Sequence, residues 1–449
     1  MRPWDRKEDI FDCVIVGARC AGAPLATHLS RAGMKICLLD QDRIPSDQPF
    51  STHAISPLGM EYLDELGVGE KVRGSCPKVS TNRIQVGSSR ADLVLSEGRE
   101  MYCPRRSTLD PLLAEAAVGA GADLRDETAV LGLIRDREAN GATARVNGVR
   151  ARHAGKTYEI RARHVIGADG RNSTIAKLVR AEEYHVTETP RGGYWAYYPV
   201  TPSFAALPFQ TYIEIRGPAS RFAFRTDGDL VLAGALDTIE AARTWTRDIE
   251  RHVHASLQKS EVLGPLVEGN RPVSRFRGLL RGKFFFRTPV GPGWALVGDA
   301  GLHKDPTPGY GITDALRDAK ALSLALVNGR DAALDVYWRR RDVQSVPLYA
   351  NASAMGSLDY DNPFNRIVIG KLGSDPGFAG TLRAILEREL SPFEAIPAWR
   401  VLAWAGSALL RGRTEILPHF VQDAKRGTWV TKETRYRQGL LDDAERRLA

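Results

Sequence analysis

An apolar strand that runs directly into a glycine-rich turn constrains the fold of this chain most strongly. In the stretch DCVIVGARCAGAPLATHL, residues 12–29, the apolar residues 13–16 precede Gly17, and a helical pattern follows. This is the layout of the fingerprint G-x-G-x-x-G, in which N–H groups at a helix N-terminus face a diphosphate. The last glycine is Gly22, but the middle position holds Arg19. We therefore expect a nucleotide site in which the Arg19 side chain turns toward the diphosphate or toward solvent.

A second strand follows at the distance expected of a β-α-β unit. Strands are expected at 12–16 and 35–40, joined by a helix over about 21–31. Asp40 ends the second strand, where an acid accepts hydrogen bonds from the adenosine ribose hydroxyls in such units. Ala21 is small, as a close approach of the backbone requires. The segment predicts a Rossmann-type opening that binds a nucleotide; the alternative is a unit of this kind without a ligand.

Composition and charge exclude several other classes of protein. The chain has 449 residues, 43% hydrophobic and 26% charged, which predicts two or three globular domains. It holds no apolar run of about 18 residues, and its charged N-terminus resembles no secretory signal, so we expect a cytoplasmic protein without a membrane span. Its 62 Lys and Arg residues are interleaved with 54 acidic residues, so no nucleic-acid partner is expected despite the net charge of +8. The five cysteines form no C-x-x-C pair, which favours reduced thiols and no metal site.

The middle of the chain alternates between helical and strand patterns. Amphipathic helices are expected over 56–68 and 105–124, with two strands and a turn over 81–95 between them. Residues 128–163 predict three strands joined by turns at EANGA and HAGK. From about 184 to 286, aromatic and β-branched residues alternate around turn signals such as TDGD, which predicts a broad antiparallel sheet.

Two further turns combine glycine and aspartate after a strand. Asp169-Gly170, in VIGADGRNSTIAKL, would either bring a carboxylate beneath the same diphosphate or simply cap the helix that follows. Gly298-Asp299, in GWALVGDAG, ends another buried strand, and residues 309–312 then open a long helix. A helix N-terminus at that point favours negative charge on a ligand ring. Each of these turns is common when it occurs alone.

In this order, the three motifs resemble those of the FAD-dependent monooxygenases of the aromatic-hydroxylase type, whose archetype is p-hydroxybenzoate hydroxylase. The resemblance spans most of the chain up to about Gly329 and is looser beyond it. It implies that the nucleotide is FAD. Besides Arg19, the chain departs from the family at Leu302, where the family places a histidine, and His303 is expected to point elsewhere. No catalytic acid or base is therefore carried over.

The resemblance also implies which residues would hold FAD. The fingerprint and the strand-end acid would bind the ADP half, the Asp-Gly turn the diphosphate, and the Gly-Asp turn the ribityl chain. The flavin ring would lie against a proline and the N–H groups of the long helix, with an arginine at an earlier helix start beside it. The cofactor-binding candidates are Gly17, Arg19, Ala21, Gly22, Asp40, Arg106, Asp169, Gly170, Asp299, Pro306, Gly309, Gly311 and Ile312.

The implied fold is α/β: a Rossmann-like FAD-binding domain with an inserted antiparallel-sheet substrate domain and a mainly helical C-terminal region. The FAD-binding domain would be discontinuous, over residues 1–76, 102–178 and 284–335. The substrate domain would comprise 77–101 and 179–283, and the helical region 336–449.

In the family that the chain resembles, NAD(P)H reduces FAD, dioxygen adds at C4a, and the hydroperoxide oxidises an electron-rich substrate. The substrate would be an aromatic or apolar small molecule lying between the flavin and the sheet. Its predicted contacts are Trp195, Tyr197, Tyr212 and Phe224, with Tyr194, Tyr198 and Phe222 as further candidates; core packing is the other interpretation of each.

Three polar residues near the expected flavin stay open at this point. His53 would lie at the moving edge of the flavin or be a structural histidine, while Lys304 and Asp305 would face the active site or a solvated loop.

Other functions share this framework. Geranylgeranyl-reductase-like enzymes have a similar Gly-Asp segment, and flavin-dependent halogenases carry a W-x-W-x-I-P stretch that GGYWAYYPV does not match. A non-enzymatic alternative is a lipid- or partner-binding protein like the Rab GDP-dissociation inhibitors. The intact PGYGI segment favours a flavin enzyme over that alternative. Hydroxylation or epoxidation, NADH or NADPH, and a monomer or homodimer all stay open.

Overall fold

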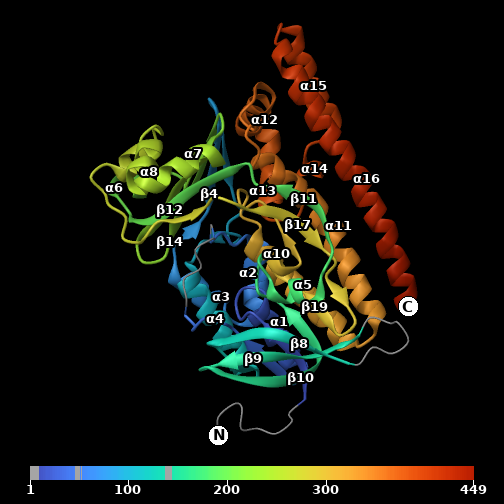
Figure 1. Ribbon diagram of the computed structural model, residues 1–449. Coiled ribbons are helices and arrows are strands. Elements are labelled where there is room, and N and C mark those ends of the chain that lie inside the picture. Colours follow the sequence, from blue (N-terminus) through green and yellow to red (C-terminus); the bar gives the residue numbers. More distant parts are fainter. Residues whose placement is uncertain (1–9, 46–50, 52, 137–143) are drawn as a thin grey trace.

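Three larger β-sheets, a two-stranded sheet of β3 (Lys78–Val79) and β6 (Met101–Tyr102), and a long helical arm form the described part of the protein (Figure 1). This computed structural model describes residues 10–45, 51, 53–136 and 144–449. The expected turn at EANGA, residues 138–142, lies outside the described residues. None of the helices in these ranges has the length and apolar character that a bilayer crossing requires.

The first sheet is built on the predicted β-α-β opening. Its strands β1 and β2 pair in parallel, and β10 and β19 continue the parallel sheet on the other side of β1. The order is β18 (Val290–Gly291), β19 (Trp294–Leu296), β10 (Lys156–Gly167), β1 (Phe11–Val16), β2 (Ile36–Leu39) and β7 (Asp123–Arg125). The antiparallel strands β8 (Thr128–Arg135) and β9 (Val146–His153) extend from β10 as a separate layer.

Alternation of side chains along β1 gives this sheet two different cores. Cys13 and Ile15 pack against helices, whereas Val14 and Val16 pack toward the β8–β9 layer. The helical side consists of α1 (Gly22–Arg31), α2 (Pro57–Leu66), α3 (Gly69–Ser75), α4 (Arg106–Gly119) and α10 (Gly311–Asn328). The short helix α5 (Thr174–Val179) lies on the other side. Both faces are therefore buried, which explains why β1 and β2 are almost wholly apolar.

The second sheet has seven strands and one helix-covered face. Its order is β16 (Arg277–Leu279), β12 (Arg191–Pro199), β15 (Leu230–Thr238), β14 (Ala219–Thr226), β13 (Thr211–Arg216), β4 (Thr81–Val86) and β5 (Ser89–Val94). Helices α6 (Pro202–Ala205), α7 (Ile239–Thr244), α8 (Ile249–Leu257) and α9 (Gly264–Val267) lie along the insertion. The residues of α8 and α9 share a buried core with Tyr198 and Tyr212. The opposite face carries Trp195 and Phe224.

The predicted sheet over 184–286 needs three corrections. First, β11 (Glu183–Glu188) and β17 (Lys283–Arg287) leave it and form a separate sheet with β20 (Leu302–His303). Second, β13 pairs in parallel with β4, so the sheet is not wholly antiparallel. Third, residues 239–267 are mostly helical; the capping side chains of Thr238 and Asp248, which accept from backbone N–H groups three residues on, were the overlooked signal.

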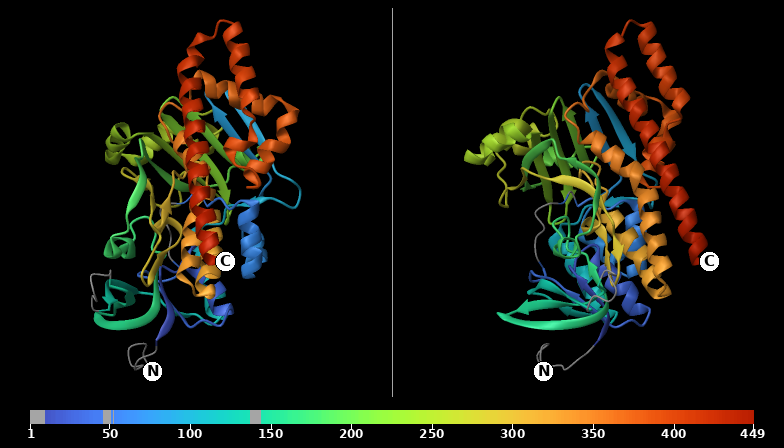
Figure 2. Two further views of the ribbon diagram at one scale, coloured as in Figure 1. Left: turned by 90° about the vertical axis from the view of Figure 1, so that its right-hand side faces the viewer. Right: turned by 45° about the vertical axis from the view of Figure 1, so that its right-hand side comes forward.

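The C-terminal region is helical, as expected. Helix α11 (Asp331–Met355) packs lengthwise against α16 (Leu417–Leu448), and both views of Figure 2 show the two helices side by side. In the sequence, four helices separate α11 from α16: α12 (Pro363–Ser374), α13 (Ala379–Leu386), α14 (Pro392–Ala395) and α15 (Ala398–Leu410). The α/β fold class with a helical C-terminal region is thereby confirmed.

A buried carboxylate ties the helical arm to the third sheet. Asp342 on α11 is fully buried and contacts the guanidinium of Arg341 at 2.7 Å and that of Arg437 on α16 at 3.1 Å. It also accepts a hydrogen bond of 2.6 Å from the hydroxyl of Tyr184 on β11. Because Arg341 is itself buried, the pair is stable only while both members are present.

We predict that Asp342→Ala destabilises the protein by about 3–5 kcal/mol, because it leaves the buried Arg341 cation uncompensated. Urea denaturation followed by circular dichroism measures this loss. The control is Asp64→Ala, which removes a partly exposed pair with Arg73 at 2.7 Å and is expected to cost less than about 1 kcal/mol. Equal effects of the two substitutions would contradict the role assigned to Asp342.

Candidate active site

Three strand-end turns meet at the carboxyl edge of the first sheet. A Cβ on Gly17 would lie 2.4 Å from the carbonyl oxygen of Ala168, and one on Gly22 would lie 1.8 Å from the carbonyl oxygen of Gly17. A Cβ on Gly298 would lie 2.8 Å from that of Ala21. The φ angle of Gly17 is +104°, which an L side chain rarely adopts. The fingerprint, the Asp-Gly turn and the Gly-Asp turn are therefore in backbone contact, although they lie far apart in the sequence.

The turns open onto one elongated cavity of about 580 Å³. Every predicted cofactor residue except Gly22 lines it, and Gly22 lies behind the lining, against Gly17. The residues shared by the prediction and the cavity are Gly17, Arg19, Ala21, Asp40, Arg106, Asp169, Gly170, Asp299, Pro306, Gly309, Gly311 and Ile312. The cavity thus runs from the end of β2 to the start of α10.

The arginine in the middle fingerprint position turns toward acids at the end of β2. Its guanidinium contacts Asp42 at 2.5 Å and Asp40 at 3.5 Å. Asp40 accepts hydrogen bonds from the N–H groups of Ala18, at 2.9 Å, and Asp42, at 3.0 Å. Nη1 of Arg19 is buried without a hydrogen-bond partner in the described part of the chain. Arg19 therefore brings an unused donor to the cavity wall.

The carboxylate of the Asp-Gly turn caps the helix that follows it. Asp169 accepts from the hydroxyl of Ser173 at 2.5 Å and from the N–H groups of Thr174, at 2.6 Å, and Ile175, at 3.2 Å. Burial raises the pKa of Asp169, and these hydrogen bonds oppose that effect. Of the two interpretations given above, capping accounts for its side chain, while its position on the cavity wall leaves the diphosphate contact as a proposal.

The carboxylate of the Gly-Asp turn is held by a histidine. Asp299 lies 3.1 Å from Nδ1 of His303, so the expectation that His303 points elsewhere is wrong. The direct reason is that β20 pairs with β17, which returns His303 to the cavity beside the turn. Burial alone would raise the pKa of Asp299, but His303, Lys304 and Arg171 together lower it. Asp299 is therefore an ionised hydrogen-bond acceptor in the middle of the cavity.

Cys20 and Asp314 also line the cavity but were not among the predicted site residues, because no motif marked them. Oδ1 of Asp110 contacts both Arg106 and Cys20. The Arg106 guanidinium donates to it at 2.8 Å, and the Cys20 thiol lies 3.5 Å from it. Burial raises the pKa of the Cys20 thiol, so it stays protonated. Lys304 reaches the Asp314 carboxylate in the first turn of α10 at 2.8 Å.

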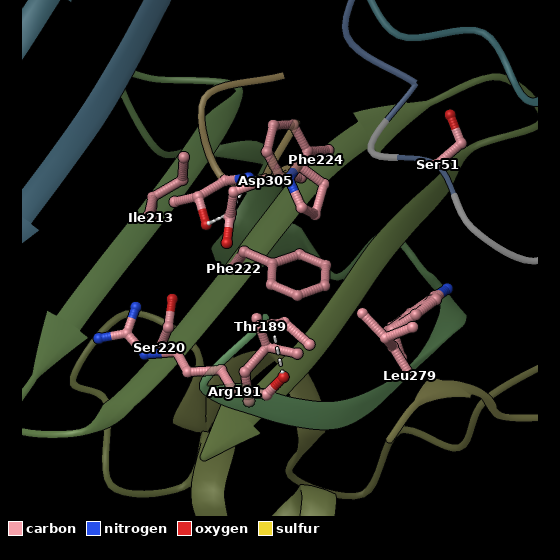
Figure 3. Close-up of a pocket in the computed structure, with 13 residues that line it drawn as sticks. Ser51, Thr189, Arg191, Ile213, Ser220, Phe222, Phe224, Leu279 and Asp305 are labelled. Atoms are coloured by element: carbon pink, nitrogen blue, oxygen red, sulfur yellow. Dashed lines mark hydrogen bonds between the residues drawn. The ribbon is translucent and has the colours of Figure 1, made fainter. Parts of the chain in front are cut away.

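A second, mainly apolar cavity adjoins the first. Its lining includes Trp195, Phe222 and Phe224 from the second sheet, as Figure 3 shows for the two phenylalanines. Ser51, Asp305 and Pro306 line both cavities, so the two are continuous at that point. Lys304 and Asp305 are both buried, which excludes the solvated-loop interpretation.

Alternation along the strands decides which aromatic side chains reach the apolar cavity. Trp195 and Phe224 line it, but Tyr212 does not, which corrects that prediction. Tyr212 points to the opposite face of the sheet, where it packs with α8 and α9 and donates to Gln85 at 3.0 Å. Tyr194 and Tyr198 lie in the same helix-covered core.

Tyr197 has the orientation of Trp195 but is not part of the cavity lining. Its hydroxyl lies 2.7 Å from Nε2 of His53, and the two rings are stacked at 5.8 Å. Burial, followed by the charge of Arg106, lowers the pKa of His53 to about 3, so the imidazole is neutral. His53 is therefore a buried partner of Tyr197.

The shape and donors of the elongated cavity suit an extended dinucleotide. Glycines lie where the backbone must approach a ligand, an arginine donor is unused, and two helix N-termini face the cavity, from α1 and α10. FAD would fit with its ADP half near Asp40 and its ring near Pro306.

Comparison with known proteins identifies an FAD-binding domain in the first half of the chain. Residues 11–231 match the family described as "FAD binding domain". Among curated proteins, conditioned medium factor receptor 1 of Dictyostelium discoideum is 24% identical over 369 residues, which cover 75% of this chain and 67% of that protein. A digeranylgeranylglycerophospholipid reductase of Methanosarcina mazei is 28% identical over 38% of this chain. A 12-dehydrotetracycline 5-monooxygenase/anhydrotetracycline 6-monooxygenase of Streptomyces rimosus is 30% identical, also over 38% of this chain. These last two matches span only 40% and 32% of the relatives' own lengths.

Solved structures share the whole architecture at low identity. The flavin-dependent brominase Bmp2 superposes with a TM-score of 0.73 at 17% identity, covering 90% of this chain and 100% of that one. The p-nitrophenol 4-monooxygenase PnpA of Pseudomonas putida DLL-E4 gives a TM-score of 0.72 at 16% identity, covering 85% and 97%.

The matched domain and the glycine-lined cavity define this protein as an FAD-binding flavoprotein. More closely, the matched domain is similar to that of a Streptomyces rimosus monooxygenase, and the fold is similar to that of p-nitrophenol 4-monooxygenase.

We predict that Asp299→Ala lowers FAD retention by at least about tenfold while the fold stays intact, because a carboxylate that accepts from a bound ligand contributes about 1.5–3 kcal/mol. The visible flavin absorbance per protein after gel filtration measures retention, and circular dichroism checks the fold. Asp64→Ala, on the surface, is the control and should retain FAD like the wild type. An unchanged FAD content in the Asp299 variant would contradict its role.

Proposed function

We propose that the protein uses NAD(P)H and O2 to hydroxylate or epoxidise an aromatic or polyketide-like small molecule on bound FAD. The observation that carries this proposal is the junction of two cavities: a glycine-lined, polar one and an apolar one meet at Asp305 and Pro306. An oxygen-transferring flavin enzyme needs that arrangement, because the substrate must lie next to the flavin ring, away from bulk water. Bound FAD would supply the redox chemistry and the activation of dioxygen.

The residues of the chain would bind FAD, orient the substrate and shield both from water. The fingerprint turn and Asp40 would hold the ADP half, and Asp299 the ribityl chain. The N–H groups at the start of α10, residues 309–312, would stabilise negative charge on the pyrimidine edge of the ring. Trp195, Phe222 and Phe224 would form the apolar wall against which an aromatic ring packs.

The relatives support the coarse part of this proposal. The Streptomyces rimosus relative is named as a monooxygenase of tetracycline intermediates, which suggests a polycyclic aromatic substrate for this chain as well. The match covers only 38% of this chain and 32% of that protein, so the choice of substrate rests on the apolar cavity.

A second candidate is a flavin-dependent reductase of isoprenoid double bonds. It is favoured by the likeness to the digeranylgeranylglycerophospholipid reductases and by an apolar cavity that would also accept a prenyl chain. Oxygen dependence separates the two reactions, since a reductase needs none.

We expect phenolic and polycyclic aromatic compounds to accelerate NAD(P)H consumption by the FAD-loaded protein, with a product heavier by one oxygen atom. Spectrophotometric screening of such compounds followed by mass spectrometry tests this. Parallel assays with a prenyl lipid under anaerobic conditions are the matched comparison. Turnover of the lipid without oxygen, and no stimulation by any aromatic compound, would favour the reductase.

A further inference from the structure

Asp305 is the one carboxylate in the described part of the chain that lines both cavities. It lies between β20 and α10, directly before Pro306, and only 6% of it is exposed. Its Oδ1 accepts hydrogen bonds from the N–H of Thr307, at 2.9 Å, and from the Thr307 hydroxyl, at 2.6 Å. Thr307 thus fixes the orientation of the carboxylate and leaves Oδ2 for another partner.

The end of α11 closes the space behind Oδ2. A Cβ on Gly356 would lie only 2.0 Å from this oxygen, so the carboxylate packs directly against the backbone there. No donor in the described part of the chain makes a hydrogen bond to Oδ2. Oδ2 is therefore available as an acceptor for a ligand in the cavity.

A buried cation lies on the same wall of the apolar cavity. Arg191 at the start of β12 is 3% exposed and donates to the carbonyl oxygens of Pro218, at 2.9 Å, and Met355, at 3.1 Å. Its Nη2 has no hydrogen-bond partner in the described residues. Figure 3 shows Arg191 and Asp305 among the residues that line this cavity. The cavity therefore presents an unused donor and an unused acceptor within otherwise apolar walls.

Burial raises the pKa of Asp305, and the Thr307 hydrogen bonds, then Arg191 and His303, oppose this rise. Arg191 on β12 and His303 on β20 are the charged or titratable groups that act on this carboxyl. A carboxylate with a raised pKa is a stronger base than one in water.

We propose that Asp305 is the catalytic carboxylate that binds a hydroxyl group of the aromatic substrate. Oδ2 accepts the hydrogen bond from that hydroxyl and then takes its proton. The substrate O–H bond breaks and an O–H bond forms on Oδ2, so the step is a proton transfer without oxidation or reduction. The resulting aryl oxide is electron-rich, as attack by electrophilic oxygen requires, and Nη2 of Arg191 stabilises its charge. This assignment rests on the proposed function, and it defines the substrate class as hydroxyl-bearing arenes.

The test compares a ligand that carries a hydroxyl group with its methyl ether, which has no hydrogen to donate. FAD-loaded protein is titrated with 2-naphthol and with 2-methoxynaphthalene, and binding is followed by the change in the visible flavin spectrum. The wild type is expected to bind the naphthol about tenfold or more tightly, as a hydrogen bond to a charged group predicts. In Asp305→Ala, the two ligands should bind equally within about threefold, because the acceptor is gone.

Proton transfer is tested by the pH dependence of naphthol-stimulated NAD(P)H consumption. In the wild type, kcat/KM should fall as the pH drops through the raised pKa of Asp305, since the protonated carboxyl accepts no proton. Asp305→Asn keeps the shape of the side chain and should lose this acid limb. Arg191→Met removes a cation that favours the ionised carboxylate, so the acid limb should move to higher pH.

The matched control is Asp359→Asn, the same change of charge at an exposed carboxylate that also acts on Arg191 but lines neither cavity. It should keep the preference for naphthol. Equal binding of the two ligands by the wild type, including no binding of either, or an unchanged preference in Asp305→Ala, would overturn the assignment. Failure of the proposed function shows itself separately, as a protein that retains no FAD or consumes no NAD(P)H with any aromatic compound.

Discussion

The structure depends on backbone contact between the turns after β1 and β10. The carbonyl oxygen of Ala168 occupies the space where Gly17 would carry a side chain, and the carbonyl oxygen of Gly17 does the same for Gly22. Any larger residue at Gly17 or Gly22 would push the two strand ends apart and move every donor that faces the cavity. The Gly-Asp turn then packs against Ala21, which adds the third strand end. One set of close contacts thus defines both the carboxyl edge of the sheet and the cofactor cavity.

The apolar cavity depends on a part of the chain that no motif marks. The carbonyl oxygen of Met355, at the end of α11, fixes the Arg191 guanidinium, and the adjacent Gly356 supports the Asp305 carboxylate. Arg388, from the segment after α13, forms an ion pair with Asp314 in the first turn of α10. The helical region therefore does more than cover the protein: it orients and buries polar groups where the two cavities meet.

The glycine-containing turns could be predicted because their geometry is local. The sheet face on which a side chain lies could not, because it depends on elements that are distant in the sequence. Trp195 and Tyr212 both belong to aromatic, alternating strands, yet they lie on opposite faces of one sheet. Helices α8 and α9 cover the Tyr212 face, and the sequence offered no expectation of those helices. His303 was expected outside the site for a similar reason, because β20 is only two residues long and its pairing with β17 is a long-range contact.

The sequence by itself determined the Rossmann-type opening and the three glycine-containing turns, because each turn needs particular residues at fixed spacing for backbone reasons. The resemblance of these turns to those of a known family implied FAD as the cofactor. Only the tertiary structure decided which aromatic rings face the cavity, that Arg19 pairs with Asp40 and Asp42, and that Asp305 lies where both cavities meet. These features result from contacts between segments more than twenty residues apart, whose register and burial no local pattern encodes.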